Sequence, residues 1–217
     1  MAGLVQSLIE TVIGEAAGEA VLPAVDHRMV YIVEGEVTVT DRRDIRRLGE
    51  NSGTYVQGEV TLHAEVPSRI WTFQLSPDAA DPAAYAGSHV RLERPLDDIA
   101  VPGRYVMRLD RVDFPPGAVA HTHTHTGPGI RVVKTGAIEI QEHGTSHHYR
   151  AGEAWFERGP DPVRAPTTEA EPTAFIRCMV ATPEWRGRST IAYVDPADAD
   201  LPKLQRYFRF IDTLIEV

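Results

Sequence analysis

Three histidines alternate with threonines near the middle of the chain. They are His121, His123 and His125, and glycine and proline pairs lie on both sides of them, at 115–117 and 127–129. In an extended strand, residues i, i+2 and i+4 point to one face, and threonine favours that backbone. Imidazole nitrogens are common ligands of divalent metals, so this spacing suggests metal binding. The other interpretation is a surface histidine tract without a fixed geometry.

The reach of the side chains limits how many of these histidines can share one ion. Side chains at i and i+2 lie roughly 7 Å apart along a strand, and those at i and i+4 roughly 13 Å apart. Ligand nitrogens bind a metal at about 2.1 Å, so two neighbours converge easily, whereas all three would need a bent strand. The spacing therefore predicts a pair, either His121 with His123 or His123 with His125.

The segment resembles the first motif of the cupin superfamily, Gly-x5-His-x-His-x3–4-Glu-x6-Gly. Gly117, His123, His125, Gly129 and Gly136 reproduce its spacing. The resemblance selects His123 and His125 as metal ligands. It implies a bicupin, a chain with two barrels, whose second domain is of the conserved-barrel type.

Two of the usual cupin ligands are missing from their positions. Gly129 stands where the first motif has glutamate, and Val163 stands where the second motif has histidine. Other groups must complete the site, or the site is vestigial. The candidates to complete it are His121, Glu157, His147 and His148. Glu157 could instead be an exposed acid paired with Arg158.

Arg131 lies two residues beyond Gly129, so on a strand it shares that residue's face. A guanidinium inside the barrel mouth would bind a carboxylate, enolate or phosphate bidentately. The alternative is an outward arginine on a twisted edge. We therefore assign Arg131 as a candidate anion clamp, and Glu157 or His121 as third metal ligand or general base.

Short strand-like runs bounded by Gly, Pro or Asp recur from residue 29 onward and predict an all-β fold. The two halves also resemble each other: residues 30–39 align with 131–140, and 64–77 with 170–183. A period near 100 residues indicates two copies of one domain. With the resemblance, the expected architecture is two tandem cupin barrels (double-stranded β-helix, or jelly roll).

We predict a degenerate N-terminal cupin half over 1–95, without a metal motif. A C-terminal barrel with the histidine cluster follows over 96–190, and a tail packing on the barrels over 191–217. The Pro- and Ala-rich stretch 76–103 is the expected linker. Apolar residues at helical spacing predict a short amphipathic helix over 4–13, and aromatic and β-branched residues favour a strand over 207–215.

Composition narrows the class of partner. The chain has 217 residues and a net charge of −9, from 22 basic and 31 acidic residues. An acidic surface repels phosphate backbones and anionic lipids, so we expect neither nucleic acid nor membrane partners. No signal peptide is recognisable. The single cysteine, Cys178, lies in a strand-like run and is expected to be a buried thiol, which suits a cytoplasmic protein.

The sequence therefore predicts a metal-binding cupin enzyme that acts on a small organic anion in its C-terminal barrel. Zinc, iron, nickel, manganese and copper are all candidate metals, because imidazole binds several of them. Known cupin reactions imply a dioxygenase, an isomerase or cyclase, or a lyase. The alternative is a non-catalytic small-molecule-binding or vestigial module. The resemblance also implies a homodimer, although two barrels in one chain can be stable as a monomer.

Overall fold

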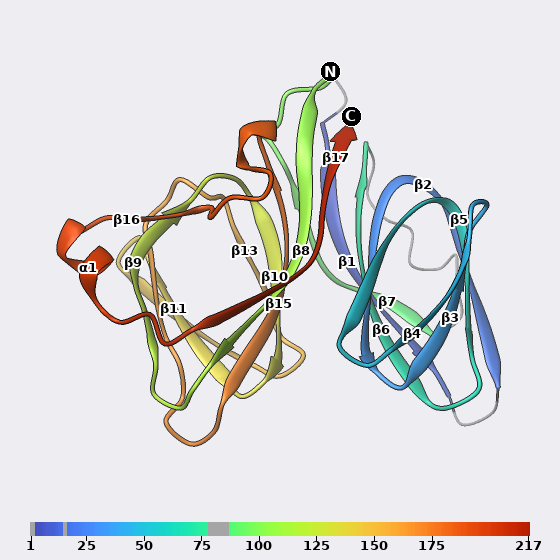
Figure 1. Ribbon diagram of the computed structural model, residues 1–217, viewed down its shortest axis with the longest axis horizontal. Helices are drawn as coiled ribbons and strands as arrows, with labels where there is room; N and C mark the ends of the chain where they lie inside the picture. The colour runs from blue at the N-terminus through green and yellow to red at the C-terminus, as the bar shows by residue number, and fades with distance from the viewer. Residues whose placement is uncertain (1–2, 15–16, 78–86) are drawn as a thin grey trace. The chain divides into compact units, whose positions relative to one another are not determined.

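The computed structural model describes residues 3–14, 17–77 and 87–217 and consists mainly of β-strands (Figure 1). The chain divides into two compact units, Met1–Gly103 and Arg104–Val217, here called unit 1 and unit 2. Within the described residues, no helix is long and apolar enough to cross a membrane. The predicted all-β fold is confirmed.

Unit 1 is built on one seven-stranded sheet in the order β4-β3-β5-β2-β6-β1-β7. The strands are β1 (Val5–Ile13), β2 (Gly18–Glu34), β3 (Glu36–Thr40), β4 (Ile45–Gly49), β5 (Ser52–Ala64), β6 (Ser68–Ser76) and β7 (Ser88–Pro95). The sheet curves around an apolar core that includes Ile9, Val30, Ile32 and Ile70. Alternate side chains of a strand point to this core.

The predicted N-terminal helix is wrong, because residues 5–13 form strand β1. This strand pairs antiparallel with β6 on one side and β7 on the other. Both of its faces are largely buried, so its sequence shows no alternation of apolar and polar residues and imitates a helical period. Val5, Ile9, Val12 and Ile13 are β-branched residues that suit a strand.

The predicted linker over 76–103 is also partly wrong, because it contains β7. This strand pairs with β1 from Val5↔Pro95 to Thr11↔Ser88. Its burial is weak on both faces, which explains why its sequence lacks an apolar signal. The central part of the predicted linker, residues 78–86, lies outside the described residues.

Unit 2 contains two five-stranded sheets, β13-β10-β15-β8-β17 and β12-β11-β14-β9-β16. The first is formed by β8 (Arg104–Phe114), β10 (Gly129–Thr135), β13 (Ala154–Glu157), β15 (Thr173–Ala181) and β17 (Arg206–Glu216). The second is formed by β9 (Val119–His125), β11 (Ala137–Glu142), β12 (Thr145–Arg150), β14 (Val163–Pro166) and β16 (Ile191–Tyr193). Val112, Phe114, Val133, Trp155 and Phe175 are among the residues of the core between them.

The C-terminal segment is part of both sheets of unit 2. After the 3-10 helix η2 (Pro183–Trp185), β16 pairs with β9 and, beyond the short helix α1 (Pro196–Asp200), β17 pairs with β8. In Figure 1 the red end of the chain follows this course from β16 through α1 into β17. The strand expected over 207–215 is therefore confirmed, and the segment carries side chains close to the histidines.

The internal repeat is visible in the strand pairing. In unit 1, β6 lies between β1 and β2, and in unit 2, β15 lies between β8 and β10. Val30 pairs with Thr72, and the aligned Arg131 pairs with Arg177. The turns after β2 and β10 contain Gly35 and Gly136, both at positive φ, a conformation that glycine adopts readily.

Candidate functional site

His123 and His125 lie at the C-terminal end of β9 with their rings in contact. Both side chains are buried, at 5% and 7% exposure, and their Nε2 atoms are 3.2 Å apart. The Nδ1 atom of His123 lies 2.7 Å from the His121 carbonyl oxygen. A carbonyl can only accept, so Nδ1 is the donor and Nε2 of His123 carries a lone pair. His123 is thus preorganised, because an outer hydrogen bond orients a ligating histidine.

His121 is not brought into the site through its side chain. It is one-third exposed, and its Nδ1 lies 3.7 Å from an Asp198 oxygen on α1. The reason is a β-bulge: Val163 pairs with His123, but Ala165 pairs with Ala120, so β9 has one extra residue here. The bulge breaks the alternation that the sequence suggested between His121 and His123, and His121 supports the site through its backbone carbonyl.

Glu157 is buried beside the histidines. It is 7% exposed, and its Oε1 accepts a hydrogen bond from Trp155 Nε1 at 2.8 Å. Its Oε2 lies 3.4 Å from His125 Nε2 and 2.8 Å from Arg131 Nη2. Of the two interpretations from sequence, the structure places Glu157 inside the barrel, and not as an exposed acid.

Arg131 also points into the barrel and is fully buried. Its Nη1 donates to the Gly129 carbonyl at 2.5 Å and to the Glu157 carbonyl at 3.4 Å. Nη2 is close to the Glu157 carboxylate, but the angle is poor: both Nη2 and Oε2 are buried without a well-directed hydrogen bond. Burial lowers the pKa of Arg131 to about 10, so the guanidinium stays charged near neutral pH.

Both imidazoles are held in the neutral form. Burial lowers the pKa of His123 below its ordinary value. For His125 the pKa is lowered well below that value by burial and also by the nearby positive charges of Arg131 and Arg177. Neutral imidazole is the form that binds metal ions, so the environment favours ligands over cations at these positions.

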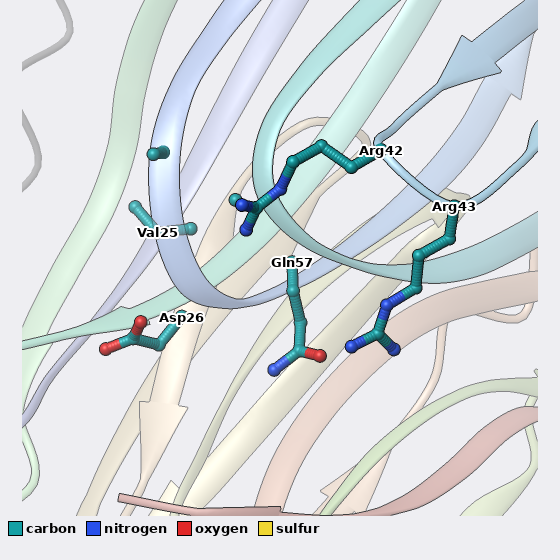
Figure 2. A pocket seen from close by; sticks show the side chains of 7 residues that line it. Val25, Asp26, Arg42, Arg43 and Gln57 are labelled. Carbon is teal, nitrogen blue, oxygen red and sulfur yellow. The ribbon is translucent and has the colours of Figure 1, made fainter.

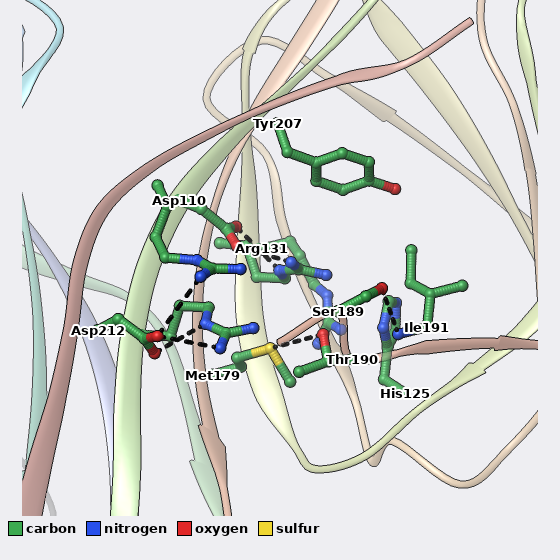
Figure 3. A network of polar contacts seen from close by, with 12 residues as sticks. Asp110, His125, Arg131, Met179, Ser189, Thr190, Ile191, Tyr207 and Asp212 are labelled. Atoms are coloured by element: carbon green, nitrogen blue, oxygen red, sulfur yellow. Dashed lines mark hydrogen bonds and ion pairs between the residues drawn. The ribbon is translucent and has the colours of Figure 1, made fainter. Parts of the chain in front are cut away.

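Sequence reasoning missed a second buried ion pair in the same layer. Arg177 donates from Nε and Nη2 to the two carboxylate oxygens of Asp110, at 2.9 and 2.7 Å. Figure 3 shows Asp110, Arg131 and His125 as parts of one polar network. The available signal was Arg177 as the single charged residue of the run 175–180, and Asp110 as one of three charged residues in the strand-like run 106–112.

The remaining predicted candidates lie elsewhere. His143, His147 and His148 are exposed at the β11–β12 turn and on β12, and Arg158 is exposed beyond the end of β13. Cys178 is fully buried, as predicted. None of these side chains lines the space at the histidine pair.

A larger hollow of the described residues lies away from the histidines. It has a volume of about 590 Å³ and is lined in unit 1 by Val25, Asp26, Arg42, Arg43 and Gln57, with Ala24 and Gly58. Figure 2 shows the two arginine side chains extending from the β3–β4 turn beside Gln57. No histidine lines this hollow, and its lining comes from β2, β5 and the β3–β4 turn. We therefore place the candidate site in unit 2 on the basis of its side-chain chemistry and not of its volume.

The donor atoms fit a metal ion in type and spacing. Bonds of about 2.1 Å separate two ligands of one ion by roughly 3.0 Å in an octahedron and 3.4 Å in a tetrahedron. The observed 3.2 Å between the two Nε2 atoms and 3.4 Å from His125 to Glu157 lie in this range. The set is incomplete, because Arg131 engages Glu157. Across the described ranges, no group of three or more His, Cys, Asp or Glu side chains forms a ready metal site.

Comparison with known proteins identifies the fold. No family model and no curated protein matches the chain. Among solved structures, a single-residue variant of oxalate decarboxylase from B. subtilis matches with a TM-score of 0.63 and 11% identity, covering 93% of this chain and 74% of that one. AerE from Microcystis aeruginosa matches with a TM-score of 0.57 and 11% identity, covering 78% and 84%.

A mutant salicylate 1,2-dioxygenase from Pseudoaminobacter salicylatoxidans matches with a TM-score of 0.50 and 14% identity, covering 82% of this chain and 70% of that one. The chain has the cupin fold. The two glycines that bound the motif, Gly117 before β9 and Gly136 after β10, both lie in turns at positive φ. Val163, at the position of the second-motif histidine, pairs directly with His123, so the missing ligand would have stood beside it.

Proposed function

We propose that unit 2 binds a divalent metal ion through His123 and His125 and acts on a small organic anion. The observation that carries this proposal is the buried pair of Nε2 atoms 3.2 Å apart, with Glu157 Oε2 3.4 Å from His125. Oε2 lacks a well-directed hydrogen bond, so it has a lone pair for a third metal bond. Glu157 thus takes the place of the glutamate that the motif lacks at Gly129.

The residues of unit 2 prepare this site in distinct ways. A bound divalent ion would polarise an oxygen of the ligand and stabilise negative charge on it. Trp155 fixes Oε1 of Glu157, which leaves Oε2 to bind the ion or to accept a proton from the substrate. Arg131 balances the carboxylate charge, and burial of the whole cluster excludes bulk water.

The resemblance to solved enzymes supports the substrate class. The matching proteins are by title an oxalate decarboxylase and a salicylate 1,2-dioxygenase, and oxalate and salicylate are both organic acids. We transfer only the class of small organic anion, since the fold hosts many reactions. The metal is zinc, iron, nickel, manganese or copper. Cytoplasmic location and a homodimer stay predictions.

A non-catalytic binding module is the second candidate. Arg131 lies 2.8 Å from the carboxylate that would complete the metal site, and this ion pair would be self-sufficient without metal. His123, His125, Arg131 and Glu157 are among the sixteen residues that line an inner space of about 20 Å³, which holds one water molecule or one ion. The two candidates therefore differ in whether that space binds a cation.

Metal analysis of protein purified without a histidine tag tests the proposal. We expect about one equivalent of metal after titration of the chelator-treated protein with Zn²⁺, Mn²⁺, Fe²⁺, Ni²⁺ or Cu²⁺ in turn, and a higher melting temperature with the preferred ion. His123→Ala and His125→Ala should abolish both effects. His143→Ala, at an exposed turn histidine, is the matched control and should change neither. Absence of binding for all five ions would leave the non-catalytic module.

A further inference from the structure

A second space of about 300 Å³ opens next to the histidine site. It shares three lining residues with the inner space, namely Arg177, Ile191 and Tyr207. The other lining residues are Arg108, Asp110, Ser189, Thr190 and Arg209. Ligand pockets begin at about this size, whereas the inner space of about 20 Å³ holds one ion or water. Of these two spaces, only the outer one has room for a molecule of several atoms.

The outer space carries one surplus positive charge. Its three guanidiniums, on Arg108, Arg177 and Arg209, face two carboxylates, Asp110 and Asp212. All three guanidinium nitrogens of Arg108 already donate hydrogen bonds, to both carboxylate oxygens of Asp212 and to the carbonyls of Arg188 and Trp185. The surplus charge is that of Arg209, whose side chain is 37% exposed and lies 3.6 Å from Asp212. A single negative charge on a ligand would therefore balance the cluster.

Arg177 has the donor that such a ligand needs. It is 3% exposed, and its contacts with Asp110 use Nε and Nη2, which leaves Nη1 for a ligand. Arg131, the anion clamp expected from sequence, directs its donors to Gly129 and Glu157 instead. The more suitable anion clamp is thus Arg177, one strand away from Arg131.

The side chains that line the outer space can contact the apolar part of a ligand. Figure 3 shows the ring of Tyr207 extending over the space between Arg131 and Ile191, with Ser189 below it. Ile191 and Tyr207 contribute apolar surface and line both the outer and the inner space. The Ser189 hydroxyl oxygen accepts from the Ile191 N–H at 3.4 Å, so its own proton remains available for a ligand oxygen.

We propose that the outer space binds the substrate, a small organic monoanion with an apolar body, through Arg177 Nη1 and Ser189 Oγ. The apolar body lies between Ile191 and Tyr207, and the reactive atom points towards the histidine pair. The assignment of this ligand as a substrate rests on the proposed function of the site. Its binding does not, because neither Arg177 nor Ser189 is a metal ligand.

Calorimetric titration with benzoate tests the binding site, since benzoate combines one carboxylate with an apolar ring. Benzamide is the uncharged probe of the same shape. In metal-free and metal-loaded wild-type protein we expect benzoate to bind at least about tenfold more tightly than benzamide. The paired variant Arg177→Gln/Asp110→Asn removes both charges together, so no buried charge is left alone, and should weaken benzoate binding about tenfold or more.

Two further variants distinguish a loss of the binding site from a loss of folding. Ile191→Trp fills the space from its rim and should abolish benzoate binding, while Arg150→Gln, on the exposed strand β12, should leave it within about twofold. Circular dichroism and melting temperature establish that each variant is folded. The inference is overturned if wild-type protein binds no benzoate, if benzamide binds equally well, or if the Arg177→Gln/Asp110→Asn protein keeps full affinity.

The His123→Ala variant separates this inference from the proposed function. Without metal binding, it should still bind benzoate within about threefold of metal-free wild type. Loss of metal binding in all proteins, with benzoate binding intact, would contradict the proposed metal site alone. Metal binding without any benzoate binding would contradict the outer anion site alone.

Discussion

Arg131 and Glu157 bring two opposite full charges into the interior of unit 2, next to two neutral imidazoles. Removing one member of a buried ion pair leaves the other charge uncompensated, at a typical cost of about 3–5 kcal/mol, whereas replacing both with apolar residues is often neutral. Here Glu157 also accepts from Trp155, so its loss leaves an indole N–H unpaired as well. The pair therefore determines both stability and the availability of Oε2.

For the Arg131–Glu157 pair we predict a non-additive double-mutant cycle. Arg131→Met and Glu157→Leu should each lower the free energy of unfolding by about 3 kcal/mol. The double variant should lose clearly less than the sum, because no charge is then left alone. Urea unfolding of the metal-free proteins, followed by circular dichroism, gives the three values. Additive losses would mean that the 2.8 Å contact is energetically unimportant.

At the scale of single strands, β10 explains why the motif glutamate is absent. A Cβ atom on Gly129 would collide with the Cys178 carbonyl oxygen and lie 2.7 Å from Met179 Cα on β15. The close approach of the two strands therefore requires glycine here. The carboxylate has to come from another strand, and Glu157, which pairs with Gly129 on β13, is the nearest substitute.

We therefore predict that restoring the motif does not restore the site. Gly129→Glu and Gly129→Ala should both lower the free energy of unfolding by about 2–3 kcal/mol through overpacking, and Gly129→Glu should bind metal no more tightly than wild type. Gly49→Ala is a control at a glycine with open space around it and no positive φ, and should change the free energy of unfolding by less than about 1 kcal/mol. Tighter metal binding by Gly129→Glu would show that β10 and β15 can separate.

The elements differ in how well their sequences predicted them. Strands with one buried face, such as β3 and β11, alternate clearly and were recognisable. Strand β1 was not, because burial on both faces removes the period of two. The face of His121 could not be predicted, since a bulge depends on the pairing of β9 with β14. Arg177 was missed because its partner, Asp110, is distant in sequence and adjacent only through strand pairing.

At the scale of the whole molecule, each unit contains a row of three residues paired across neighbouring strands that includes the aligned positions Val30 and Arg131. In unit 1 the row is Ile9, Thr72 and Val30, and in unit 2 it is Asp110, Arg177 and Arg131. Apolar and hydroxyl side chains in one copy correspond to three charged groups in the other. The charged row beside the histidines thus has apolar and hydroxyl residues as its counterpart in unit 1, where the buried polar pair Arg28 and Gln74 lies one row further along.

If the metal site lies in unit 2 alone, metal binding should stabilise unit 2 and leave the stability of unit 1 unchanged. Core substitutions in each unit identify which unfolding transition belongs to which unit. Ile32→Ala, in the core of unit 1, should lower the stability of that unit by about 2–5 kcal/mol, and Val133→Ala in unit 2 by about 2 kcal/mol. The preferred metal, at about 100 times its dissociation constant, should add about 2.7 kcal/mol to unit 2. In scanning calorimetry, metal should therefore raise the component that Val133→Ala lowers and leave unchanged the component that Ile32→Ala lowers. A metal-induced rise in the component sensitive to Ile32→Ala would place the ion in unit 1 and contradict the assignment of the histidine pair.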